Sequence, residues 1–115
     1  MARLTLYGIP NCDTVRRARR ELDAAGLVHD FRDFRKEGLD PDRLDRWIAR
    51  VGWERLLNRR GTTWRRLPEE QREGIDAARA RELLLAEPTL IRRPVIERDG
   101  EVFVGWERGV QDLLG

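Results

Sequence analysis

The order of helices and strands that the sequence predicts is the feature that most restricts its fold. Residues 3–9 alternate between apolar and polar side chains, as a half-buried strand does. A helical pattern runs from Thr14 to a stop at Gly26, and residues 27–34 form a second segment that suits a strand. Because two strands joined through one helix form a parallel pair by a right-handed crossover, the start of the chain predicts a β-α-β unit.

The core of this β-α-β unit is expected to be apolar and small. One face of the helix gathers apolar residues at helical spacing, namely Val15, Ala18, Leu22 and Ala25. In the second strand, we expect Val28, Phe31 and Phe34 to be available to the core.

The middle of the chain is expected to be helical. Asp40 and Pro41 predict a helix start, because an aspartate caps the first turn and a proline fits its first position. That helix is expected to end at Gly52, and a short turn and a polar loop follow over 53–64. Two further helical segments are expected to begin at Pro68 and Asp76.

The end of the chain predicts a hairpin and a short helix. Residues 95–105 read as two strands around Asp99-Gly100, a pair that favours a tight hairpin turn. A short helix should follow, with Val110, Leu113 and Leu114 pointing inward.

This order, β-α-β, then helices, then β-β-α, predicts a thioredoxin-like three-layer α/β sandwich with a mixed sheet. We expect one domain over residues 1–115, with a helical insertion at roughly 38–87.

The composition narrows the classes of protein to which the chain can belong. Of its 115 residues, 40% are hydrophobic and 38% charged, which is typical of a globular chain and not of a disordered one. No apolar run approaches the roughly 20 residues of a membrane span, and the N-terminal segment lacks the apolar core of a signal peptide. Cys12 is the only cysteine, which excludes internal disulfides and cysteine-pair metal sites and fits the reducing cytoplasm.

The positive charge of the chain does not predict a nucleic-acid partner. The formal net charge is only +2, and the pI near 9.3 follows because few groups titrate near neutrality. The four tryptophans are far apart in the sequence and are interpreted as packing residues and not as a base-stacking platform. We expect neither a nucleic-acid nor a membrane partner.

Cys12 lies where the first strand gives way to the first helix, and this location suits a reactive thiol. The helix dipole and the unpaired N–H groups of the first turn stabilise a thiolate over a thiol and also form a cradle for an oxyanion. Arg16 and Arg17 are expected to add positive charge, whereas Asp13 opposes it. The alternative is an inert, buried cysteine. Because Val15 stands where a C-x-x-C motif would have its second cysteine, redox turnover would need an external thiol such as glutathione.

Three segments resemble the arsenate reductase (ArsC) family of thioredoxin-like proteins. LTLYGIPNCDTVRRARRELDAAG is similar to the opening of these proteins, and LLNRRGTTWRRL and LIRRPVI are similar to the YffB-type branch, which is also related to the Spx regulators. The resemblance covers nearly the whole chain in order and with matching spacing. It implies a thioredoxin-like sheet with a helical insertion.

The resemblance also implies roles for individual residues. Cys12 matches the nucleophilic cysteine, Arg93 the oxyanion-binding arginine of the family's RP motif, and Pro94 the cis-proline that faces the cysteine. Arg60 matches the arginine of the YffB and Spx branches, although Asn58 is an alternative for that column in arsenate reductases proper. With Asn11 beside the cysteine, we expect Arg60, Arg93 and Pro94 to form the substrate or glutathione site.

One departure from the family pattern affects the expected substrate. Gly105 and Trp106 stand where arsenate reductases carry a third arginine, and Arg108 is out of register. We therefore predict a glutathione-dependent thiol oxidoreductase that uses glutathione as co-substrate, binds no resident cofactor or metal, and acts on a small thiol, disulfide or oxyanion, or on a protein thiol partner. The alternatives are a non-enzymatic Spx-like regulator or adaptor and a true arsenate reductase.

Overall fold

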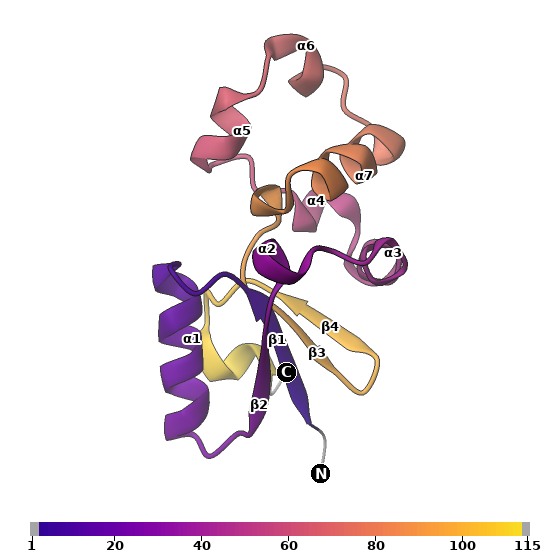
Figure 1. Ribbon diagram of the computed structural model, residues 1–115. Coiled ribbons are helices and arrows are strands. Elements are labelled where there is room, and N and C mark those ends of the chain that lie inside the picture. The colour runs from indigo at the N-terminus through magenta and orange to yellow at the C-terminus, as the bar shows by residue number, and fades with distance from the viewer. Residues whose placement is uncertain (1–2, 114–115) are drawn as a thin grey trace. The chain divides into compact units, whose positions relative to one another are not determined.

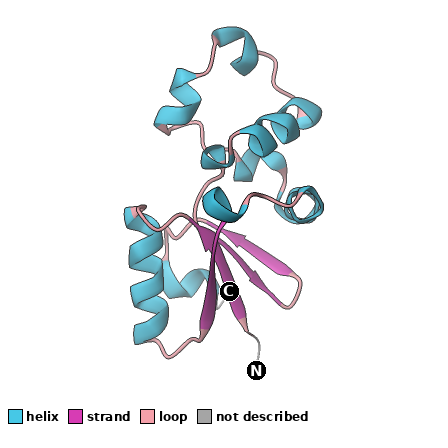
Figure 2. Cartoon of the chain, viewed as in Figure 1, coloured by secondary structure: helices cyan, strands magenta, loops and turns pink. Residues whose placement is uncertain are grey.

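The computed structural model describes residues 3–113, which contain one four-stranded sheet (Figure 1). Its strands are β1 (Leu4–Gly8), β2 (His29–Asp33), β3 (Val95–Arg98) and β4 (Glu101–Val104), in the spatial order β2-β1-β3-β4. Figure 2 distinguishes these strands from the helices by colour. Within the described residues, no helix is long and apolar enough to cross a membrane.

The pairing of the strands confirms the mixed sheet that the sequence predicts. β1 pairs with β2 in parallel, and β3 pairs antiparallel with both β1 and β4. Asp99 and Gly100 form the turn between β3 and β4, and both have positive φ, 50° and 83°. Two successive left-handed residues match the twist of a tight hairpin, which explains why an Asp-Gly pair stands there.

The first helix, α1 (Asp13–Ala24), packs on one face of the sheet together with the C-terminal 3-10 turn η2 (Gly109–Leu113). Figure 1 shows both on the same side of the strands. The core between them is formed by Leu4, Leu6, Val15, Ala18, Leu22, Ile96, Trp106 and Leu113. The C-terminal segment predicted as a short helix is a 3-10 turn, and Leu114 lies outside the described residues.

Three details of the β-α-β prediction are wrong. Ala25 is exposed because it is the C-cap of α1 and not part of its inward face. Val28 is 68% exposed because it lies before β2, whose pairing with β1 begins at His29. Phe34 is buried as predicted, but it begins a short helix, α2 (Phe34–Glu37), whose first N–H groups are capped by the Asp33 carboxylate.

The chain divides into two compact units, one formed by the segments up to Gly38 and from Arg93, and the other by Leu39–Arg92. We call them the sheet unit and the helical unit. The helices of the helical unit are α3 (Pro41–Val51), α4 (Trp53–Leu56), α5 (Thr62–Arg66), α6 (Glu69–Arg72) and α7 (Ala77–Ala86), followed by the 3-10 turn η1 (Pro88–Leu90).

The starts of the two long helices in the helical unit follow from their caps. The Asp40 carboxylate accepts a hydrogen bond from the N–H of Asp42, and the Asp76 carboxylate accepts one from the N–H of Arg79, at 3.0 and 2.9 Å. Leu44 and Trp47 are the fully buried residues of α3. These features confirm the helices predicted at Asp40-Pro41 and Asp76.

The helical unit is closed by backbone contacts between α4 and the segment after η1. Leu57 and Ile91 form an isolated antiparallel bridge, and the N–H of Arg92 donates to the carbonyl of Leu56 at 2.7 Å. The compact unit therefore continues to Arg92, whereas the sequence predicts a helical insertion that ends near residue 87.

Candidate active site

Cys12 is the N-cap residue of α1. Its backbone is extended (φ −105°, ψ 124°), and its carbonyl accepts the first helical hydrogen bond from the N–H of Arg16 at 2.9 Å. Its side chain makes no capping hydrogen bond and is partly exposed. The thiol therefore lies at the positive end of a three-turn helix but does not cap its free N–H groups.

Gly8, at the end of β1, brings the strand close to the start of α1. A Cβ atom at Gly8 would lie 2.8 Å from Cγ2 of the buried Val15, too near for any side chain without a shift. Glycine at this position therefore allows the strand and the first turn of α1 to approach each other. The sequence alone predicts no such role for Gly8, because the contact depends on how β1 packs against α1.

The sheet register brings the segment of Cys12 and that of Pro94 to the same edge. Tyr7 pairs with Val95 in the antiparallel β1–β3 ladder, so the chain leaves β1 where it enters β3. The Arg93–Pro94 peptide bond is cis, as the resemblance implies. The N–H of Gly105 donates to the Pro94 carbonyl at 2.9 Å, which adds the end of β4 to this edge.

Arg93, Pro94 and Asn11 differ in their exposure at this edge of the sheet unit. Pro94 is buried, Arg93 is partly buried with its Nε shielded from solvent, and Asn11 is exposed in the turn before Cys12. An arginine in such a place presents a permanent charge in partly desolvated surroundings, where its attraction for an anion is stronger than in water.

Arg16 and Arg17 contribute less positive charge than the sequence predicts. The Arg16 guanidinium pairs with the Asp13 carboxylate. Arg17 donates to the Trp106 carbonyl at 3.1 Å, and its Nε lies 3.7 Å from an oxygen of Glu21. Both arginines are therefore partly neutralised, whereas the helix N-terminus keeps its positive field beside the thiol.

Trp106, which the resemblance to the family places near its third arginine, is a packing residue. Its side chain is 2% exposed, and its indole Nε1 donates to Oε1 of Glu21 at 2.9 Å. Glu21 thus joins Arg17 and Trp106 through one carboxylate. Because an indole carries no charge, this position supplies no electrostatic attraction for an oxyanion.

Arg60 belongs to the helical unit, where it lies in the turn that precedes α5. Its side chain is exposed, and among residues 3–113 no carboxylate pairs with it. The N–H of Arg60 donates to Oδ1 of Asn58 at 3.1 Å. Asn58 therefore shapes the turn that presents Arg60, whereas the resemblance offers it only as an alternative to Arg60 in the family pattern.

The prediction of a polar loop up to residue 64 is wrong, because residues 62–64 belong to the helix α5 (Thr62–Arg66). This helix has five residues and buries none of them, so it lacks the apolar periodicity from which a helix can be predicted. It begins directly after Gly61 and ends before Pro68.

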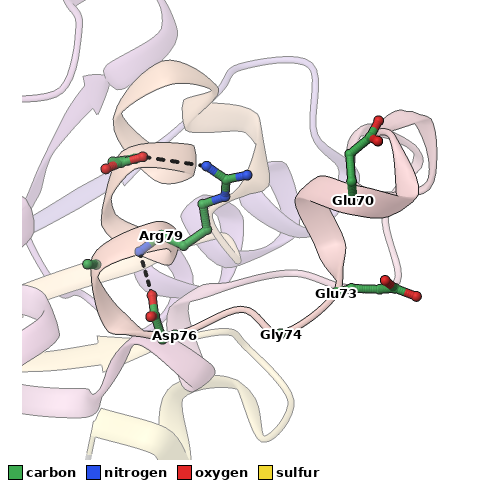
Figure 3. Close-up of a pocket in the computed structure, with 7 residues that line it drawn as sticks. Glu70, Glu73, Gly74, Asp76 and Arg79 are labelled. Atoms are coloured by element: carbon green, nitrogen blue, oxygen red, sulfur yellow. Dashed lines mark hydrogen bonds and ion pairs between the residues drawn. The ribbon is translucent and has the colours of Figure 1, made fainter.

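The helical unit also contains an open pocket between α6 and α7 (Figure 3). Four of its lining residues are acidic, namely Glu70, Glu73, Asp76 and Glu82. Asp76 caps α7, and Arg79 lies 3.8 Å from Glu82. Because the pocket is rich in carboxylates and none of the predicted site residues lines it, we do not assign it to the binding of an anionic thiol.

The sheet unit combines a mixed sheet, a cysteine at the start of the helix after β1 and a cis-proline before β3, which together define a thioredoxin-like protein. The model of the ArsC family matches residues 7–110, and the chain belongs to this family. This membership supports a thiol-oxidoreductase type of function.

Proteins of similar sequence and structure agree with this assignment. The chain is 46% identical to a YffB protein of known structure, with a TM-score of 0.86 over 90% of this chain and 91% of the other. It is 51% identical to an arsenate reductase (ArsC) related protein from Brucella melitensis, with a TM-score of 0.80 over 96% and 92% of the chains. An uncharacterized protein from Haemophilus influenzae is 41% identical over 90% of each chain.

Proposed function

We propose that this protein is a glutathione-dependent thiol oxidoreductase with Cys12 as its single nucleophile. The observation that carries the proposal is the location of the Cys12 thiol, which is partly exposed at the N-terminus of α1 and makes no capping hydrogen bond. A thiolate at such a place is stabilised by the helix dipole and is accessible to a disulfide.

The reaction has two thiol–disulfide exchange steps. The Cys12 thiolate attacks the glutathione sulfur of a mixed disulfide between glutathione and a substrate thiol. The substrate leaves as a thiolate and takes a proton from water, while Cys12 and glutathione form a disulfide. The thiolate of a second glutathione then attacks the glutathione sulfur of this adduct, which releases oxidised glutathione and restores the Cys12 thiolate. The net reaction converts the mixed disulfide and one reduced glutathione into the substrate thiol and oxidised glutathione.

Arg93 and Arg60 are the residues that we assign to the carboxylates of glutathione. Each guanidinium offers a planar set of N–H donors that can bind a carboxylate through two hydrogen bonds. We assign Asn11 to polar contacts beside the thiol. Pro94 has no N–H, and its carbonyl accepts a hydrogen bond from Gly105. We expect its ring to contact the bound thiol peptide.

The proposal requires no resident cofactor or metal, because glutathione supplies the electrons. It places the reaction in the cytoplasm, where glutathione is kept reduced and a chain with one cysteine can turn over without an internal partner thiol. The reducible partner is a small disulfide, an oxidised small molecule or a protein thiol bound to glutathione.

The decisive experiment is mass spectrometry of the purified protein after treatment with oxidised glutathione, followed by peptide mapping. We expect one glutathione on Cys12, its removal by reduced glutathione, and turnover of a glutathione mixed disulfide. Cys12→Ser is the matched control, since serine keeps the size of the side chain but is a far weaker nucleophile; it should take no adduct and lose all measurable turnover.

A wild-type protein that takes no glutathione on Cys12 would overturn the proposal. Retention of the same cellular protein by the wild type and by Cys12→Ser would then favour the adaptor function. Arsenate-dependent oxidation of glutathione would instead identify arsenate as a substrate despite Trp106.

A further inference from the structure

The cation of Arg59 lies between two tryptophan rings in the helical unit. Its guanidinium carbon is 5.6 Å from the ring centroid of Trp53 and 5.7 Å from that of Trp64, both within the range of a cation–π contact. Trp53 is the first residue of α4 and Trp64 lies in α5, so Arg59 connects the two helices on either side of its own turn. Both tryptophans are half-buried, whereas Arg59 is exposed.

Three hydrogen bonds hold the segments on either side of Arg59. Asn58 donates its N–H to the carbonyl of Leu90 at 2.8 Å and accepts from the N–H of Arg60 through its side chain. The hydroxyls of Thr63 and Thr89 lie 3.2 Å apart. These contacts fix both ends of the turn, but within the described residues none of them involves the side chains of Arg59 or Arg60. Within the described residues, the stack on Trp53 and Trp64 is the contact that holds the Arg59 side chain in the exposed middle of the turn.

We propose that Arg59 is a positioning residue, which holds the turn in the conformation that presents Arg60 to a carboxylate of glutathione. The inference rests on the proposed function, because Arg60 is its anion-binding residue in the helical unit. A long arginine side chain loses conformational freedom when it binds, and a turn that is already ordered reduces this loss. In this proposal Arg59 contributes this order through its ring contacts, and it acts through Arg60 and not as a second ligand.

Direct binding of Arg59 to glutathione is the alternative that the experiment must exclude. The ring contacts cover the flat surface of the guanidinium and leave its N–H edge able to reach a carboxylate. A double-mutant cycle with Arg60 separates the two roles. A positioning effect disappears when Arg60 is absent, whereas a direct contact persists.

The experiment uses the full chain with Cys12→Ser, so that binding is measured without disulfide exchange. The probe is oxidised glutathione, titrated by NMR, and the dissociation constant is compared among Arg59→Met, Arg59→Lys, Arg60→Ala and the double variant Arg59→Met/Arg60→Ala. Arg65→Met is the matched charge control, since it removes an exposed arginine of α5 for which the described residues show no contact with a tryptophan ring. The indole signals of Trp53 and Trp64 report the stack without any ligand.

We expect Arg59→Met to weaken binding about threefold to tenfold, as the loss of two exposed cation–π contacts implies. Arg59→Lys should restore binding to within about twofold, because lysine keeps the cation. Arg59→Met should have no further effect in the Arg60→Ala background, and Arg65→Met should change binding less than Arg59→Met. The indole signals should shift in Arg59→Met much more than in Arg59→Lys.

Three results would overturn the inference. They are unchanged affinity in Arg59→Met, an equal loss from Arg59→Met with and without Arg60, and no effect of Arg60→Ala itself. Failure of the proposed function is a separate result, because it is detected in wild-type protein as the absence of a Cys12 adduct, whatever these affinities are.

Discussion

The two turns that carry the predicted site residues are fixed by different means. In the sheet unit, the segment of Cys12 and that of Arg93 and Pro94 are held by strand register, because β1 ends where β3 begins. In the helical unit, the turn of Arg60 belongs to no strand, and its order comes from the Asn58 side chain, a threonine pair and the Arg59 stack. A segment held by strand pairing and close packing tolerates little added side-chain volume, whereas a turn held by exposed side-chain contacts can adjust its conformation.

The largest expected difference between the two turns comes from adding one methyl group to each. In Gly8→Ala the new Cβ would meet Cγ2 of the buried Val15 at 2.8 Å, so strand and helix must move apart. We expect a loss of roughly 1–3 kcal/mol in the free energy of unfolding. In Gly61→Ala the new Cβ would meet only the Asn58 side-chain amide, 3.0 Å from its Nδ2. A shift of a few tenths of an ångström relieves this contact while Oδ1 keeps its hydrogen bond from Arg60, so we expect a change within about 0.5 kcal/mol.

Urea unfolding of both glycine variants measures this difference. Neither glycine has a positive φ, so the substitutions test space and not backbone strain. Equal losses at the two positions would contradict the distinction between a packed edge and an adjustable turn.

A smaller difference is expected between two tryptophans. Trp106→Phe removes an indole N–H that donates to Glu21 in a part-buried hydrogen bond. We expect it to cost roughly 1–3 kcal/mol of unfolding free energy, since hydrogen bonds to charged groups contribute most. Trp64→Phe keeps an aromatic ring beside Arg59 at a half-buried position, and a loss below about 1 kcal/mol should follow. Thermal or urea unfolding checks both values, and a greater loss for Trp64→Phe would sink this expectation.

The smallest expected effect is the contribution of one exposed ion pair in each unit to the pH dependence of stability, and here the two units should behave alike. Arg81 holds the pKa of Asp45 in the helical unit below its ordinary value through hydrogen bonds, and Arg3 does the same to the pKa of Asp30 in the sheet unit. A lowered carboxyl pKa stabilises the folded state above the ordinary aspartate range, roughly pH 3.9, and this contribution is lost as pH falls through the lowered pKa.

Asp45→Asn and Asp30→Asn should therefore be slightly less stable than the wild type at neutral pH and should equal it in strong acid. Both pairs are exposed, so the neutral-pH difference should be close to the detection limit and should shrink with added salt. Unfolding curves from pH 2 to pH 7 provide the measurement. A gap that stays constant down to the lowest pH would show that the ion pair is not its cause.

The parts of the fold that the sequence predicts are those with a local chemical signal. The alternation of residues 3–9, the Asp40-Pro41 cap and the Asp99-Gly100 turn each specify one element, and the structure contains all three. The short helices α2 and α5 could not be predicted, because four or five residues are too few for an apolar period.

The candidate site also contains features that a local sequence signal predicts and features that it does not. The location of Cys12 at the start of a helix follows from the local pattern around it. The hydrogen bond from Trp106 to Glu21 joins residues 85 positions apart. The close approach of Gly8 to Val15 depends on how β1 packs against α1, so no local signal marks either contact. Tertiary packing of this kind becomes visible only in the folded chain.

The covering of α1 by Trp106 and Leu113 has a consequence for how the protein is made. A ribosome synthesises α1, with Cys12 at its start, well before Trp106 and Leu113. Since β3, Trp106 and η2 are needed to complete that core, an emerging chain exposes the apolar face of α1 until these later segments have been made. The segment of Cys12 is thus translated well before the residues that enclose its supporting helix.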